Sequence, residues 1–320
     1  MKNKILATLV ALGIAGNVSA IEINENLSIN GFIDGSYSHT ETDGAADSQS
    51  LGFDEAELNF ITNVGNVDGV INIDSHNFDD LELEQAHITY SMDNGVSFTL
   101  GKYGSALGFE REDPTGLYTF SRAYGDVDNA ENANDNAFNF GHVDANAVEG
   151  ITVAYAGDAF SIAASFENGV ENGVDTNIED NELNLELSFA YTGIDNVTIG
   201  GGYFFDNQAN NADEVDALNL HVSTTMGKLF LAAEYSELDR DAAGDLDAWM
   251  VLADYDFNDK LGAALRISSN EKIGNSDYEK VTIAPNYAIT DSLGAILEYS
   301  DVENGDADSN ELALEFLYTF

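Results

Sequence analysis

The chain lacks cysteine altogether, has only two prolines, and carries 11 lysine and arginine residues against 58 aspartate and glutamate residues. The absence of cysteine excludes disulfides, thiolate metal sites and a cysteine nucleophile. The formal net charge of −47 would repel the phosphates of DNA or RNA, so a nucleic-acid partner is excluded. Beyond the N-terminus, no segment approaches the ~18 consecutive apolar residues that a membrane-spanning helix requires.

The chain contains enough apolar residues to form a folded domain. Hydrophobic residues make up 44% and aromatic residues 10% of the sequence, which is too much apolar surface for a disordered acidic chain. Glycine occurs 29 times. Frequent glycine with scarce proline favours many short strands joined by glycine turns over a helical protein.

The N-terminal segment has the pattern of a secretory signal. Lys2 and Lys4 precede an apolar run that extends to Ala15, and "VSA" at 18–20 supplies small residues for cleavage. The run is too short for a spanning helix. We therefore expect residues 1–20 to be a cleaved signal peptide and residues 21–320 to form one exported domain.

From residue 21 onward, apolar residues recur with a period of two, which predicts β-strands. The expected strands are about 9–13 residues long, a length suited to a tilted strand that crosses a membrane. Clear examples are "LSINGFIDGSYSH" (27–39), "GVSFTLGKY" (95–103), "NELNLELSFAYTG" (181–193), "KLFLAAEYSEL" (228–238) and "LGAALRISS" (261–269).

The connections between these strands alternate in length. Short turns such as "MDNG" (92–95), "GIDN" (193–196) and "NDK" (258–260) alternate with long acidic segments such as "ETDGAADSQS" (41–50) and "DNQANNADEVD" (206–216). The whole chain has seven short turns and eight long loops, which implies sixteen strands. This alternation indicates an all-β, antiparallel up-and-down transmembrane barrel of the outer-membrane type. Sandwiches, β-helices and soluble lectins also use short strands, but they do not require alternating loop lengths.

Four stretches resemble strands of Gram-negative outer-membrane porins, of the general-diffusion type or a closely related barrel family. They are "LSINGFIDGSYSH", "FDEAELNFITNVG", "LEQAHITYSMDNGVSFTLGKYGSALG" and the C-terminal "LEFLYTF". The resemblance implies a water-filled channel for ions and small hydrophilic solutes, a homotrimer, and a location in the cell outer membrane among lipid and lipopolysaccharide. An even strand number puts both termini on the periplasmic side.

The resemblance also implies that the third long loop, about 104–147, folds into the lumen and narrows the pore. This loop is the longest in the chain and contains Phe109, Leu117, Tyr118 and Phe120. Large apolar residues favour packing against the barrel wall. A surface cap over a small apolar cluster is the alternative, because a long loop can be ordered without lining a pore.

The candidate pore residues are mainly acidic. In the second expected strand, alternation with Ala56, Leu58 and Phe60 turns Glu55 and Glu57 toward the lumen. Porins of the general type carry a basic residue at the position of Glu57, and the resemblance puts Glu84 where that basic ladder continues. Strand parity, in contrast, groups Glu84 with the more apolar face. The further candidates from the third loop and from the barrel wall are Lys102, Glu110, Arg111, Glu112, Asp113, Arg122, Lys280 and Arg266, the last of which alternates with Leu265 and Ile267. Because rings of carboxylates favour cations, we expect a cation-selective conduit.

The chain ends in a strand with one apolar face. Phe316, Tyr318 and Phe320 lie on this face, whose aromatic end suits a membrane interface. By the porin resemblance, the terminal phenylalanine is read by the barrel-assembly machinery.

No enzyme is expected. The five histidines are scattered, and the sequence contains neither a HExxH, a GxSxG nor a phosphate-binding loop motif. No cofactor or specific metal site is predicted, although the acidic outer loops could gather diffuse divalent cations. Two other functions stay open: a substrate-specific channel, for instance for oligosaccharides, with Tyr103, Tyr118 and Tyr124 along its path, and a non-conducting surface adhesin or structural barrel.

Overall fold

The computed structural model describes residues 20–76, 81–110, 114–125, 138, 147–168, 170–171, 174–175, 183–207, 215–240, 244–272, 276–305 and 307–320. The expected signal segment 1–19 and Arg111, Glu112 and Asp113 of the third loop lie outside these residues.

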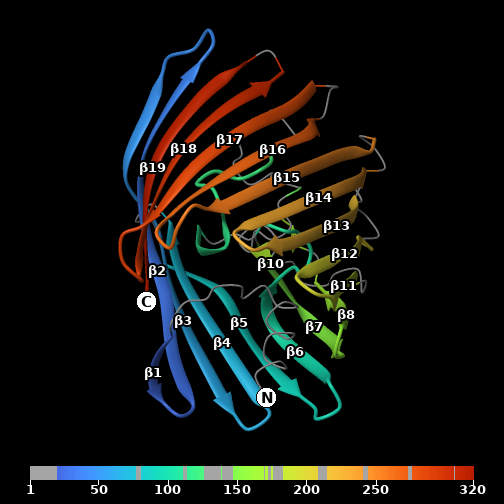
Figure 1. The fold of residues 1–320 in the computed structure, drawn as a ribbon. Coiled ribbons are helices and arrows are strands. Elements are labelled where there is room, and N and C mark those ends of the chain that lie inside the picture. The colour runs from blue at the N-terminus through green and yellow to red at the C-terminus, as the bar shows by residue number, and fades with distance from the viewer. Residues whose placement is uncertain are drawn as a thin grey trace.

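Sixteen antiparallel strands form a closed barrel (Figure 1). The ring comprises β2 Leu27–Thr42, β3 Ser48–Val64, β4 Val67–His76, β5 Glu82–Ser91, β6 Val96–Gly104, β7 Ala147–Ala156, β8 Phe160–Glu167, β11 Asn184–Ile194, β12 Val197–Phe205, β13 Val215–Met226, β14 Leu229–Arg240, β15 Leu246–Asp256, β16 Leu261–Lys272, β17 Ser276–Ala288, β18 Leu293–Asn304 and β19 Ser309–Thr319. Short strands β9 Val170–Glu171 and β10 Val174–Asp175 pair with each other between β8 and β11, and one 3-10 turn, η1, covers Pro114–Gly116. The predicted up-and-down barrel of sixteen strands is therefore confirmed.

The two ends of the barrel differ as expected. Seven connections, for example 65–66, 92–95 and 227–228, are turns of two to four residues. At the opposite end several expected acidic loops are partly strand: β16 continues to Lys272 and β17 starts at Ser276, so three residues connect them. Backbone ladders of this kind persist past the apolar belt because polar side chains are as compatible with a solvated strand as with a loop.

The barrel closes where the chain ends. β19 pairs with β2 from Ser309↔Thr42 to Thr319↔Phe32. Phe320 then continues the ladder, since its N–H donates to Gly31 O at 3.1 Å and its carbonyl accepts from Gly31 N–H at 3.1 Å. The short strand β1 Ile21–Asn24 pairs with β2 just beyond this point. Closure leaves no strand edge open, which a bilayer requires because it offers backbone groups no water.

The two faces of the barrel are inverted relative to a water-soluble protein. Large apolar side chains such as Leu265, Ile283 and Leu297 are exposed on the outside, at 47–49% of their surface. Aromatic residues stand near both ends of the outer belt, as with Trp249 and Tyr255 on β15. The buried inner positions are largely polar, among them Thr99, Asn219 and Ser300. An apolar outer belt edged by aromatics and a polar interior are the pattern of a transmembrane barrel.

Among the described residues, no helix is long and apolar enough to cross a membrane.

The outer belt yields a first prediction. Leu265 lies in the middle of β16 on the outer face, and Glu271 lies on the same face of the same strand beyond the belt. We expect Leu265→Arg to lower the free energy of unfolding by about 2–4 kcal/mol, because a charge near the bilayer midplane is costly and the cost falls toward the interface. Glu271→Arg is the matched control, expected to cost at most about 1 kcal/mol. Urea unfolding in lipid vesicles measures both, and equal losses would contradict the membrane belt.

Candidate functional site

The third loop connects β6 to β7, and its described residues, 105–110, 114–125 and 138, enter the barrel rather than capping it (Figure 1). Its first described stretch is bonded to three inner-wall strands in turn. Ala106 N donates to Glu186 Oε1 on β11 at 3.0 Å, and Gly108 N donates to Asn219 Oδ1 on β13 at 3.1 Å. Phe109 N donates to Glu234 Oε1 on β14 at 2.6 Å. The expectation that this loop folds into the lumen is confirmed for its described residues.

Arg266, in the middle of β16, is the main anchor of the loop. Its side chain is fully buried. Its guanidinium donates to Thr119 Oγ1 at 2.8 Å, to Ser121 O at 2.8 Å and to Arg122 O at 2.7 Å, and forms an ion pair with Glu110. Five fixed donors in a planar fork suit such a set of divergent oxygen acceptors, which a lysine could not satisfy. The predicted inward direction of Arg266 is found, but loop residues cover its side chain.

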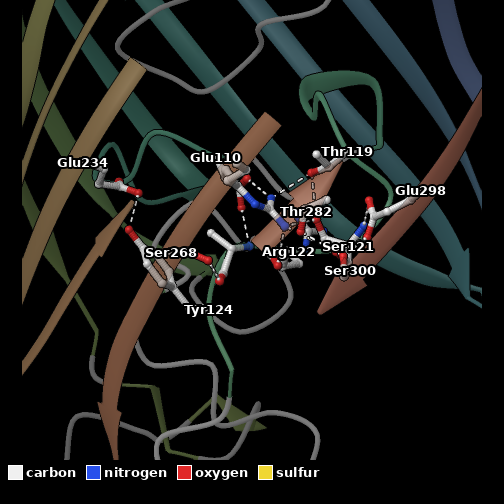
Figure 2. Close-up of polar contacts among 12 residues, drawn as sticks. Glu110, Thr119, Ser121, Arg122, Tyr124, Glu234, Ser268, Thr282, Glu298 and Ser300 are labelled. Carbon is white, nitrogen blue, oxygen red and sulfur yellow. Dashed lines mark hydrogen bonds and ion pairs between the residues drawn. The ribbon is translucent and has the colours of Figure 1, made fainter. Parts of the chain in front are cut away.

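Further wall residues hold the loop beyond this anchor. Ser121 N donates to Glu298 Oε2 on β18 at 3.1 Å, and Gly125 N donates to Asn270 Oδ1 on β16 at 2.9 Å. Tyr124 OH donates to Glu234 Oε2 at 3.0 Å (Figure 2). Strand parity would have placed Glu234 and Glu298 inside the barrel, but only the folded loop reveals that both accept hydrogen bonds from its backbone N–H and side-chain hydroxyl groups.

Apolar packing supports the same arrangement. Leu107, Ala123, Tyr124 and Phe138 of the loop share a buried cluster with wall residues that include Met250. A second contact is aromatic: the ring of Phe230 on β14 stacks on Tyr118 at 4.9 Å and on Phe109 at 6.2 Å between centroids. Burial raises the pKa of Tyr118 to about 12. The third loop is thus fixed to the wall formed by β11–β18.

The three tyrosines proposed for a sugar path differ in position. Tyr103 is buried and its hydroxyl is 2.8 Å from Ser165 Oγ, and Tyr124 is buried against Glu234. Tyr118 is half-buried and stacked. Tyr103 and Tyr124 are therefore buried, and of the three tyrosines Tyr118 alone keeps partial exposure.

The opposite wall carries a group of buried acids, here called the acidic wall. It consists of inner-face residues of β2–β5 and β19: Asp34, Glu55, Glu57, Asp74, Glu84 and Glu315. Glu55 and Glu57 are placed on this face as strand alternation predicts. Asp34, Asp74 and Glu315 were not among the predicted site residues, although each alternates with an apolar neighbour in the same way.

Glu84 shows why parity conflicted with the porin resemblance. On the β4–β5 pair, Asn72 is opposite Gln85 and Ile73 is opposite Leu83, so Glu84 is an extra residue in a β-bulge. A bulge changes the alternation of the strand that contains it. Glu84 consequently joins the buried inner face at 3% exposure, whereas Leu83 and Ile88 are exposed outside. Parity counted through the bulge gives the wrong face for Glu84.

Lys102 was predicted to line the pore, but the structure places it on the outer side of the barrel wall. It alternates with buried Tyr103 and shares the side of β6 that exposes Phe98 and Leu100, and its register partner is the exposed Glu149. Its Nζ donates to Leu83 O at 3.2 Å. The structure thus places Lys102 on the outer side of the wall and not in the lumen. Arg122 is half-buried on the third loop.

Lysine and arginine are absent from four consecutive strands of the barrel. The sequence contains no lysine or arginine between Lys4 and Lys102, a segment that includes all of β2–β5. Lys280 on β17 is bonded to Glu311 Oε2 at 2.9 Å and Arg266 on β16 is covered by the loop. The inner face therefore differs between the loop-covered wall, where Arg266 and Lys280 are paired with carboxylates, and the acidic wall, whose strands contain no lysine or arginine.

Comparison with known proteins agrees with this architecture. The structure is similar to an anion-selective porin from Comamonas acidovorans, with a TM-score of 0.66, 12% identity, and coverage of 92% of this chain and 99% of that chain. The outer-membrane channel DcaP of Acinetobacter baumannii gives a TM-score of 0.66, 15% identity, and coverage of 95% and 100%. OmpT of Vibrio cholerae in its trimer form gives 0.58, 15%, and coverage of 92% and 100%. No curated protein matches the sequence.

These likenesses, all below 25% identity, show the fold. Family membership comes from the sequence itself, because the family model of Gram-negative porins matches residues 7–307, nearly the whole chain. The closed sixteen-strand barrel matches these porin neighbours. The chain belongs to the Gram-negative porin family.

Proposed function

We propose that this chain forms a water-filled pore that prefers cations and passes ions and small hydrophilic solutes by passive diffusion. Family and fold are those of outer-membrane channels. The preference for cations rests on one observation: the acids of the acidic wall lie on the inner face of the barrel, on strands that contain no lysine or arginine. The fold does not decide this point, since a similar barrel is described as an anion-selective porin.

The physical basis of the proposed cation preference is the electrostatic field of the acidic wall. Carboxylates that line a narrow aqueous conduit with low-dielectric walls attract counter-ions and exclude ions of like charge. A transverse field needs basic residues opposite acidic ones, and here Arg266 is fully buried under the loop and paired with Glu110. The lumen field is then set mainly by carboxylates.

Reversal potentials across planar bilayers in a salt gradient test this preference. We expect the parent protein to favour K⁺ over Cl⁻, and Glu57→Lys to reduce or reverse that preference. In water, two unit charges 4 Å apart interact by about 1 kcal/mol, so each unit of charge near the ion path changes the partition of K⁺ and of Cl⁻ by roughly fivefold each, in opposite directions. The effect weakens at 1 M salt, where the Debye length is about 3 Å.

The matched control is Glu279→Lys, which makes the same change of charge on the exposed outer side of β17. It should leave the reversal potential unchanged. Anion preference in the parent, or equal effects of Glu57→Lys and Glu279→Lys, would defeat the proposal. A barrel that gives no stepwise conductance at all would instead favour the adhesin or structural alternative, and saturable sugar transport in vesicles would favour a substrate-specific channel.

The remaining parts of the proposal concern the processing, membrane location, orientation and oligomeric state of the protein. We propose removal of the signal segment 1–20, insertion of the 21–320 barrel into the outer membrane by the barrel-assembly machinery, and both termini on the periplasmic side. A homotrimer is supported by the trimer form of the similar OmpT. Lipopolysaccharide would contact the loop end of the barrel, with diffuse divalent cations at its acids. No catalysis is proposed.

A further inference from the structure

We propose that Glu55, Asp74 and His76 form a binding site for a divalent transition-metal ion, with zinc as the probe, on the inner wall of the barrel. Glu55 on β3 is directly opposite His76, the last residue of β4, and Asp74 is the preceding residue on the same face of β4. One ligand atom from each of the three side chains lies within 4.8 Å of the others. A single ion can therefore reach all three groups.

The ring of His76 is the centre of this group. Its Nε2 is 2.7 Å from Asp74 Oδ2, and its Nδ1 is 3.8 Å from Glu55 Oε2. Each ring nitrogen therefore has a carboxylate oxygen within 4 Å, so an ion bound at either nitrogen meets a carboxylate ligand. The side chain of His76 is 37% exposed, so an ion in the lumen has access to the group.

Buried oxygen atoms give a second and independent indication. Asp74 is 1% exposed, and its Oδ1 is buried with no hydrogen-bond partner. Asn72, the next inward-facing residue of β4, is 2% exposed, and its Oδ1 also has no hydrogen-bond partner. A buried polar atom without a partner is costly, and a bound cation would satisfy such acceptors.

Further carboxylates surround Glu55, Asp74 and His76, and their negative charge favours binding of a cation. Glu57 is directly opposite Asp74 in the ladder, and Asp34 is directly opposite Glu55. Glu84 is buried at the bulge of the adjacent strand β5. A set of buried carboxylates with no lysine or arginine in the whole of β2–β5 is stabilised by a counter-ion, because buried charges are tolerated when they are paired or bind metal.

The donor atoms select the class of metal. Imidazole with carboxylates suits zinc and other first-row divalent ions, whereas calcium prefers six to eight oxygen ligands. A second group of the same residue types, His39, Glu41 and Asp47, is half-buried to exposed near the loop end of β2–β3. Because its side chains are more accessible to water, we use it as the matched control and propose no site there.

Isothermal titration of zinc into the detergent-folded protein tests the proposal directly. We expect one saturable site in the parent, with affinity reduced at least about tenfold in His76→Gln and in Asp74→Asn, since even second-shell changes cost 10- to 100-fold. His39→Gln should bind zinc as the parent does, and excess calcium should not displace the zinc. Equal loss in His76→Gln and His39→Gln, or displacement by calcium, would overturn the site.

A measurement on the unmodified protein covers the case in which a variant fails to fold. X-ray absorption of the zinc-loaded parent should show an imidazole nitrogen among the nearest ligands, and an all-oxygen shell would overturn the assignment. Zinc binding is measured without any ion flow, so this proposal and the cation-selective channel succeed or fail separately.

Discussion

Replacing Arg266 by leucine is expected to release the third loop from the β16 wall and to raise the single-channel conductance. The change removes every bond that the guanidinium makes to Thr119, to the Ser121 and Arg122 carbonyls and to Glu110. It also leaves Glu110 without its cation in the interior. Breaking a buried ion pair by removing one partner costs about 3–5 kcal/mol, which shifts the docked-to-released ratio of the loop by about 100-fold or more.

Two measurements distinguish loop release from general damage. The chain has no cysteine, so Leu117→Cys offers one labelling site on the loop for a nitroxide. Nitroxide mobility at position 117 and conductance should both rise in Arg266→Leu. Arg266→Lys should give an intermediate effect, because lysine keeps the charge but loses the planar fork.

The control removes another buried cation from the same inner wall. Lys280 is paired with Glu311, with Nζ 2.9 Å from Oε2. Lys280→Gln should lower barrel stability without increasing nitroxide mobility at position 117. If Arg266→Leu leaves both mobility and conductance unchanged, Arg266 is not the anchor.

Deleting Phe320 is expected to prevent most of the chain from assembling in the outer membrane of cells while refolding in lipid vesicles is much less affected. The structure assigns to Phe320 two hydrogen bonds with Gly31 at the seam and a ring stacked on Tyr318 at 5.8 Å. Two lost hydrogen bonds account for about 1–3 kcal/mol, which a closed sixteen-strand barrel should withstand. A larger loss in cells would then reflect recognition of the terminal residue.

The amount of heat-modifiable, folded protein in the outer-membrane fraction measures the first effect, and folding yield in vesicles measures the second. Phe257→Ala is the matched control, since Phe257 is an exposed aromatic near a short turn whose ring lies 5.2 Å from that of Tyr255. It should assemble normally. Normal assembly of the Phe320 deletion, or an equal defect in vesicles, would contradict a role as an assembly signal.

Strand placement was accessible from the sequence because each strand has two chemically different environments. Along β16, Leu265 and Ile267 face lipid while Arg266 and Ser268 face inward, and the alternation is visible in the letters themselves. The same rule placed Glu55 and Glu57 correctly. It failed at Glu84 because a bulge inserts one residue and leaves no mark on the hydrophobic pattern.

The roles of inner residues were less accessible. Arg266 was predicted to line the pore, but it lies beneath a loop that precedes it by about 150 residues in the chain. Lys102 was a pore candidate through its position at the start of the third loop, yet its register places it outside the lumen. Contacts at such sequence distances depend on how the loop packs, and strand periodicity carries no information about that.

The sequence by itself therefore determined the export signal pattern, the alternating strands, the unequal connections and the excess of acid, and these follow from local chemistry repeated along the chain. Tertiary structure decided which acids form one wall, which cations are neutralised under the loop, and that Glu55, Asp74 and His76 lie together. The reason is physical: alternation between lipid and lumen acts on each residue separately, whereas a pore field or a metal site is a property of side chains that only barrel closure and loop insertion bring together.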